Sequence, residues 1–125
     1  MLRETERSAN ITADLQVDAG RCWLDLGRPA LATRALDEGL TLLDPARSRT
    51  RAVFQVVQAD SALRDHDLER AVSHAHTALE TALVTGASRC TDLVRTLIPR
   101  LAAHANGAPH VAAFLDTAEQ RLQTA

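Results

Sequence analysis

The sequence repeats itself with a period of 39 residues, and this repeat limits the possible folds more than any other feature. When the chain is shifted by that period, small residues fall on small ones and apolar residues on apolar ones. The matched pairs are Ala13 and Ala52, Val17 and Val56, Gly20 and Ala59, Leu24 and Leu63, Ala32 and Ala71, Leu36 and Ala75, Gly39 and Ala78, and Leu40 and Leu79. A fixed period of this size is typical of stacked helix pairs.

The spacing of apolar residues predicts six helices, because it follows the three-to-four rhythm of a helix face. The predicted stripes are Ile11, Leu15, Cys22, Trp23 and Leu26; Ala32, Ala35, Leu36, Gly39, Leu40 and Leu43; Val53, Val56, Val57 and Leu63; Leu68, Ala71, Val72, Ala75, Leu79 and Ala82; Leu93, Val94, Leu97, Ile98 and Leu101; and Val111, Phe114, Leu115, Ala118 and Leu122. Tyr is absent and aromatic residues make up only 2% of the chain, whereas an all-β core would need many more.

Glycine and proline mark the expected helix ends. Gly27 is placed to end the first helix and Pro29 to begin the second, where its missing N–H costs nothing. Asp44-Pro45 repeats that arrangement and predicts the start of the third helix. Pro99 lies inside the fifth helix and should kink or shorten it.

These signals together predict one all-α domain over residues 1–125, built from three antiparallel helix pairs. The expected units are repeats at about 8–44 and 45–85, followed by a capping pair at 88–124. Terminal repeats are often atypical because they cap the stack, which accounts for the weaker pattern of the last pair.

Charge and composition exclude several classes of function. A net charge of −2 is unfavourable for direct nucleic-acid binding, which needs a concentrated basic face. No run of 18 apolar residues predicts a membrane span, and the polar first residues are unlike a signal peptide. Cys22 and Cys90 lie far apart, so we expect two buried or half-buried thiols in a cytoplasmic protein rather than a disulfide.

The small and aromatic positions of the repeat resemble those of the tetratricopeptide repeat (TPR). Gly20, Trp23, Gly27, Ala32 and Gly39 fit the first copy. Ala59, the "DHDLERA" turn, Ala71 and Ala78 fit the second, although Ala62 stands where an aromatic residue is expected. The resemblance implies a right-handed superhelix, an α-α solenoid, that binds a protein or peptide on the concave face formed by the first helix of each pair.

Transferring that concave face by repeat register gives a set of candidate partner-binding residues. They are Asp14, Val17, Arg21, Leu24, Asp25, Val53, Val56, Asp60, Leu63, Arg64 and Arg95. Because the charged members alternate in sign, salt bridges between neighbouring first helices are the favoured interpretation. The alternative is a peptide carboxylate held by Arg21 and Arg64, since guanidinium groups bind carboxylates in bidentate fashion.

The stretches "LDPARSRTRAVFQVVQADSALRDHDLERAVSHAHTALETA" and "SRCTDLVRTLIPRL" resemble the C-terminal part of actinobacterial helix-turn-helix transcriptional regulators. In that family the DNA-binding domain lies at the N-terminus and is not represented in this sequence. The resemblance therefore implies either a fragment or a small stand-alone relative that acts in regulation.

Three further groups of residues are candidates for a site. Arg47, Arg49 and Arg51 could meet an acidic partner, but a solvated helix start is favoured. His74 and His76 point to nearly opposite sides of a helix, and His76 with Glu80 lacks a third ligand, so neither a metal nor a cofactor is expected. Cys22 is expected in the core rather than as a nucleophile.

The sequence thus favours a non-enzymatic protein or peptide interaction module in transcriptional regulation. One alternative is a sensor domain that holds a small molecule or signalling peptide. Another is self-association as a homodimer, because an unpaired first helix would expose Ile11, Leu15 and Trp23. An enzyme is not expected, because no convergent acid, base and nucleophile can be assembled.

Overall fold

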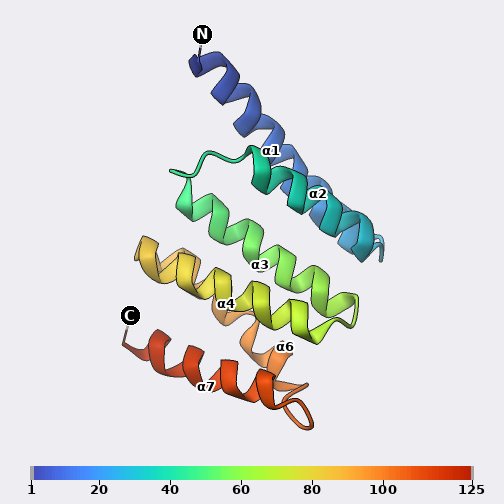
Figure 1. Cartoon of the computed structure of the whole chain (residues 1–125), viewed down its shortest axis with the longest axis vertical. Helices are drawn as coiled ribbons and strands as arrows, with labels where there is room; N and C mark the ends of the chain where they lie inside the picture. Colours follow the sequence, from blue (N-terminus) through green and yellow to red (C-terminus); the bar gives the residue numbers. More distant parts are fainter. Residues whose placement is uncertain (1, 125) are drawn as a thin grey trace.

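The computed structural model describes residues 2–124, which form helices and short connections only. The helices are α1 (Leu2–Asp25), α2 (Pro29–Leu42), α3 (Ser48–Arg64), α4 (Leu68–Thr85), α5 (Ser88–Arg95), α6 (Ile98–Ala102) and α7 (Pro109–Gln123). They follow one another in chain order along the long axis of the molecule (Figure 1). In the part of the chain that is described, no helix is both long and apolar enough to cross a membrane.

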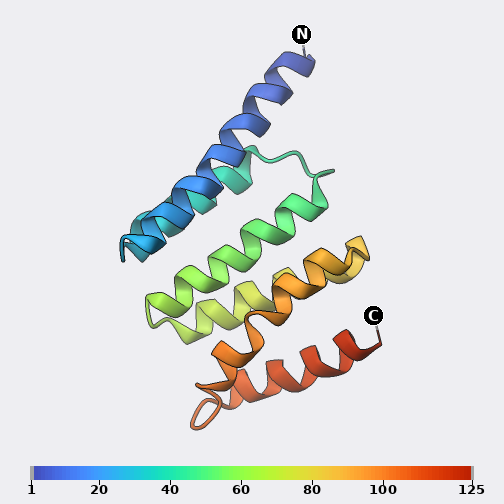
Figure 2. The ribbon, with the colours of Figure 1, turned by 180° about the vertical axis from the view of Figure 1, so that it is seen from behind.

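The helices pack in antiparallel pairs, α1 with α2 and α3 with α4, as the sequence predicts. The first two pairs contact each other through α3, which lies against α1 and α2 and also touches α5. The third pair consists of α5 and α6 together with α7, and it packs on α4. Seen from behind, α1 lies in front of α2, and α5 lies in front of α4 (Figure 2).

The 39-residue period of the sequence is also a period of burial. Ala13 and Ala52 are both fully buried, and Val17 and Val56 are both 7% exposed. The turn inside each pair follows the same shift, since α1 ends at residue 25 and α3 at 64, and α2 begins at residue 29 and α4 at 68. The prediction of two antiparallel helix pairs is therefore confirmed.

The predicted helix ends hold in the first pair and differ at the second. Gly27 follows α1 with a φ of 72°, a left-handed conformation that glycine adopts readily, and Pro29 is the first residue of α2. The prediction that Asp44-Pro45 begins the third helix is wrong, because α3 begins at Ser48. The carboxylate of Asp44 instead accepts a hydrogen bond from the backbone N–H of Ala46 (2.9 Å) and stabilises a turn.

Pro99 divides the predicted fifth helix, as expected. α5 ends at Arg95 and α6 begins at Ile98, with a turn between them. A proline cannot donate the backbone hydrogen bond that would continue the helix through this point. The third pair therefore contains three helical segments instead of two.

The first predicted apolar stripe is an exposed one, which corrects the sequence analysis. Ile11 and Leu15 are 61% and 62% exposed, and Cys22 is exposed rather than in the core. The buried face of α1 is formed by Ala13, Val17, Gly20 and Leu24. Trp23 is half-buried against the N-terminal core, and Cys90 is buried.

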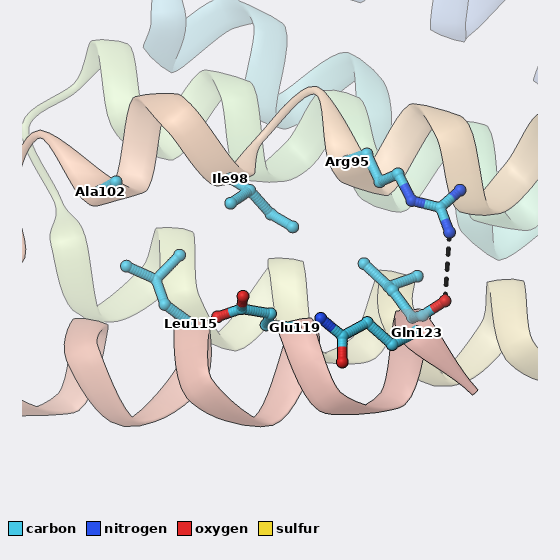
Figure 3. Close-up of a pocket in the computed structure, with 7 residues that line it drawn as sticks. Arg95, Ile98, Ala102, Leu115, Glu119 and Gln123 are labelled. Atoms are coloured by element: carbon cyan, nitrogen blue, oxygen red, sulfur yellow. Dashed lines mark hydrogen bonds between the residues drawn. The ribbon is translucent and has the colours of Figure 1, made fainter. Parts of the chain in front are cut away.

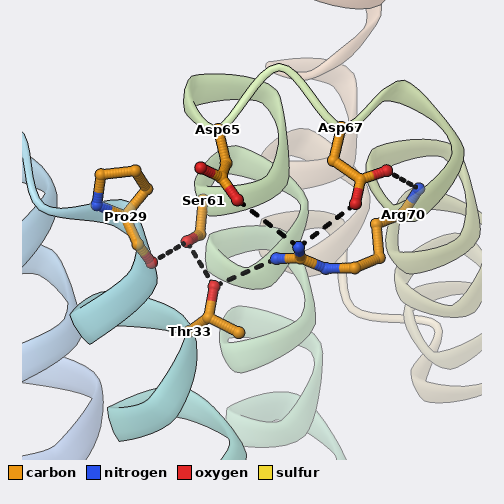
Figure 4. Close-up of polar contacts among 6 residues, drawn as sticks. All are labelled: Pro29, Thr33, Ser61, Asp65, Asp67 and Arg70. Carbon is orange, nitrogen blue, oxygen red and sulfur yellow. Dashed lines mark hydrogen bonds and ion pairs between the residues drawn. The ribbon is translucent and has the colours of Figure 1, made fainter.

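A polar network joins the beginnings of α2 and α4 to the end of α3 (Figure 4). The hydroxyl of Ser61, which is fully buried, donates to the carbonyl of Pro29 (3.0 Å) and lies 2.9 Å from the hydroxyl of Thr33. Arg70 donates to Thr33 (3.1 Å) and forms an ion pair with Asp67 (3.3 Å). The network satisfies buried polar groups and fixes α2 and α4 relative to α3.

Gly39 allows α2 to approach α3 closely, and replacing it should destabilise the protein. A Cβ atom at this position would lie 2.5 Å from Cε1 of Phe54, a fully buried ring. We expect Gly39→Ala to lower the free energy of unfolding, because overpacking costs about 1–3 kcal/mol and outweighs the gain of about 1 kcal/mol in helix propensity. Urea unfolding followed by circular dichroism measures this change.

The control for this prediction is Phe54→Leu, which removes the ring that Cβ would meet. In a double-mutant cycle, Gly39→Ala should cost less in the Phe54→Leu background than in the wild type. Equal costs in both backgrounds would contradict the proposed contact.

Candidate functional site

The candidate partner-binding residues lie on α1, α3 and α5, which together form what we call the first-helix face. Four of them are part of the core: Val17, Leu24, Val56 and Leu63 are between 3% and 8% exposed. Their side chains fill the space between helices, so a partner would contact the remaining, mostly polar members of the set.

A ladder of polar contacts crosses the first-helix face. The Arg64 guanidinium lies 3.0 Å from the carboxylate of Asp60 and donates to the carbonyl of Leu24 at the end of α1 (3.2 Å). Asp60 also forms an ion pair with Arg100 of α6 (2.8 Å). Contacts within the chain therefore occupy Asp60 and Arg64. The expected salt bridges between the neighbouring first helices do not form, because no ion pair joins Arg21 or Asp25 to these two residues among those the structure describes.

The other charged candidates on α1 differ in their environment. Asp14 forms an ion pair with Arg47 (3.3 Å), which also donates to the hydroxyl of Thr50 (3.2 Å). Arg21 and Asp25 are exposed, and neither has an ion-pair partner among residues 4–124. Of the charged candidates in the first repeat, Arg21 and Asp25 are therefore the two without an ion pair among the described residues.

Arg95 lines a hollow with largely apolar walls, and we call this hollow the third-pair pocket (Figure 3). It lies between α5–α6 and α7 and has a volume of about 500 Å³. Its lining residues are Arg95, Ile98, Ala102, Leu115, Glu119, Leu122 and Gln123. The volume is within the range of about 300–1,000 Å³ that is typical of ligand pockets.

The position of Arg95 at the pocket is fixed by two contacts. Its guanidinium donates to the carboxylate of Asp92 (2.9 Å) on its own helix and to the carbonyl of Leu122 (3.2 Å) on α7. The carboxylate of Glu119 lies on the opposite wall (Figure 3). The pocket thus combines apolar walls with one positive and one negative group.

The break at Pro99 shapes the pocket. Ile98 is the first residue of α6, and Ala102 is its last. The sequence indicates Arg95 and the break at Pro99. It does not show that Ile98, Leu115 and Glu119 lie around one space, because facing residues on different helices share no period. Proline inside an apolar stripe was the one available signal.

A smaller hollow of about 250 Å³ lies between α3 and α5 and includes Val53, another candidate residue. Its lining also contains Leu93, Arg49 and Arg89.

Of the three arginines near the start of α3, Arg47 forms an ion pair with Asp14, and Arg51 donates to the carbonyl of Leu43 (3.4 Å). Arg49 is exposed and makes no ion pair with a described residue.

The histidines of α4 lie apart from one another. The ring of His76 packs edge-on against Phe114, with centroids 6.3 Å apart. Glu80, which was weighed as a second ligand with His76, forms an ion pair with Arg121, and this hydrogen bond lowers the pKa of Glu80. Within residues 2–124, no three His, Cys, Asp or Glu side chains gather where they could hold a metal ion.

Comparisons with family models, with curated proteins and with solved structures gave no match to this chain. The structure shows an all-helical domain with paired packing. What the domain does has to be argued from its surfaces.

His74 provides a test of the packing of α4 through the pH dependence of stability. It is half-buried, and burial lowers its pKa below the usual 6.5, with a further contribution from the Arg70 cation. The unfolded chain therefore binds the proton more readily, so stability is fully present above pH 6.5 and falls as the pH drops below it.

We expect His74→Gln to lose less thermal stability than the wild type between about pH 7.5 and about pH 5.5, because it has no proton to take up. Melting temperatures from circular dichroism measure the difference. His104→Gln, at an exposed position, serves as the matched control and should behave like the wild type. An identical acid response in His74→Gln and the wild type would show that burial of this ring is not coupled to protonation.

Proposed function

We propose that the chain is a non-enzymatic, TPR-like interaction module whose helix pairs continue as a right-handed superhelix. In this proposal it binds a peptide segment of a partner protein by taking one bulky apolar side chain into the third-pair pocket. The observation that carries the proposal is the pocket itself, with apolar walls and two charged groups beside them.

The pocket walls suit an apolar side chain. Ile98 and Leu115 are half-buried and point into the space, and Leu122 is buried beside them. Filling such a space removes apolar surface from water on both partners, which contributes about 25 cal/mol per Å² buried. Docking of a peptide's apolar side chains into a hydrophobic groove is a recurring mode of peptide recognition.

The charged groups supply orientation. Arg95 can receive a carboxylate or carbonyl of the peptide, and Glu119 can accept from an N–H or a basic side chain. Because Arg95 is already held by Asp92 and by the Leu122 carbonyl, its guanidinium is preorganised and loses little freedom on binding.

An open pocket favours a peptide over a small ligand. Arg95, Ala102, Glu119 and Gln123 are all exposed, so the pocket is a groove with an open side. Small-molecule sites usually bury 70–90% or more of their ligand. A sensor domain that encloses a small molecule is therefore the weaker proposal.

The wider context follows from the resemblance of the repeat to the helical part of actinobacterial regulators. We place the partner within cytoplasmic transcriptional regulation on this basis. The chain itself has a net charge of −2, which agrees with contact to protein rather than to nucleic acid.

The proposal is tested by filling the pocket from its rim. Random peptides displayed on phage are selected on the immobilised chain, and the affinity of a selected peptide is measured by fluorescence polarisation. We expect the selected peptides to share a bulky apolar residue. We expect Ala102→Phe to weaken binding by about tenfold or more, since an anchor side chain contributes about 1.5–3 kcal/mol when buried.

Ala103→Phe is the matched control, because Ala103 is an exposed neighbour that does not line the pocket. It should bind the peptide like the wild type. Equal affinity for wild type and Ala102→Phe would show that the peptide binds elsewhere, and selection that enriches no apolar residue would contradict the anchor.

A further inference from the structure

The outer side of α1 carries a stripe of apolar residues that stay exposed among the residues the structure describes. Ile11 is 61% exposed, Leu15 62% and Leu26, just beyond the helix, 69%, with the exposed Cys22 between them. We call these four residues the outer stripe. It lies opposite the buried face of α1, which packs toward α2 and α3.

Exposed charges accompany the outer stripe along α1. Four of them are Glu4 and Arg7 toward the N-terminus and Asp18 and Arg21 toward the C-terminus, while Asp25 is the last residue of the helix. None of the four forms an ion pair with another described residue. Their order along the helix is negative, positive, negative, positive, so the set becomes complementary to itself when the helix direction is reversed.

The first described turns of α1 are exposed. α1 has 24 residues and α2 only 14, so the N-terminal end of α1 projects beyond its partner (Figure 1). Residues 4–8 are exposed. Short helical segments without tertiary contacts are only marginally stable in water, so contact with another molecule would stabilise the projecting end.

We propose that two copies of the chain associate through α1, antiparallel, about a two-fold axis at the level of residue 13. Ile11 of each copy then packs on Leu15 of the other. Arg7 lies beside Asp18 of the second copy, and Glu4 beside its Arg21. The projecting end of each α1 is covered by the C-terminal half of the other.

The charges argue for this orientation and for a second copy as the occupant. In a parallel pair each residue would face itself, so that Arg7 would meet Arg7 and Asp18 would meet Asp18. Self-complementarity under a two-fold axis is the property that a symmetric dimer interface requires. This surface is separate from the third-pair pocket, so the inference does not depend on the proposed function.

The first test is the mass of the chain by sedimentation across a concentration series from about 1 µM to about 1 mM, the range of weak protein association. We expect a monomer–dimer equilibrium that Leu15→Glu shifts at least tenfold toward monomer, because the charge would be buried in the interface. Val84→Glu is the matched control, since Val84 is 83% exposed but lies on α4. A monomer throughout, or a dimer that Leu15→Glu leaves intact, overturns the proposal.

Charge reversal tests the register. Arg7→Asp alone and Asp18→Arg alone should each weaken the dimer, because each brings like charges together. The double variant Arg7→Asp/Asp18→Arg should recover most of the lost association, since the pair is restored with opposite polarity. Effects that simply add in the double variant would overturn the antiparallel register.

A disulfide provides an independent readout. In the proposed register Cys22 faces Glu4 of the second copy, while the two Cys22 residues are offset by 18 positions, about 27 Å along the helix. Treatment with diamide, which oxidises paired thiols, should therefore crosslink Glu4→Cys into dimers and leave the wild type monomeric on a non-reducing gel, because bridged Cα atoms lie within about 7 Å. Crosslinking of the wild type through Cys22 would instead show a parallel pair and overturn the proposal.

Discussion

The burial of α3 is the constraint on which the rest of the structure depends. Ten of its 17 residues are buried, and it is the wall between two core clusters. Phe54 and Val57 pack toward the N-terminal pair, whereas Ala52, Val56 and Ala59 pack toward the C-terminal half. Neighbouring helices can pack closely on several sides of α3 only where its side chains are small, which explains why small residues recur along it.

Polar residues inside this wall set the relative positions of its neighbours. Ser61 bonds to the carbonyl of Pro29, and Gln58 donates to Asp37 (2.9 Å), so both tie α3 to α2. The ladder through Asp60 and Arg64 then joins α3 to α1 and α6. Because of these contacts, few charged side chains of the first-helix face remain unpaired. The third pair differs, since Pro99 interrupts its helix and a pocket lies beside the break.

The sequence predicted the helix pairs well because small buried residues and turn residues repeat with the same period. It misassigned the face of α1, since the stripe through Ile11 and Leu15 and the stripe through Val17 and Leu24 both have helical spacing. Spacing alone does not say which stripe meets the core. The start of α3 was misplaced because Asp44-Pro45 is equally suited to a turn. The pocket required contacts between α6 and α7, which no local pattern contains.

Partner binding at the third-pair pocket is tested most directly by a map of the bound peptide on the structure. Backbone amide NMR spectra of the chain would be recorded during titration with a peptide selected on it. We expect the largest shift changes at Arg95, Ile98, Leu115 and Glu119. Changes centred on Val53 and Leu93, or on α1, would contradict it.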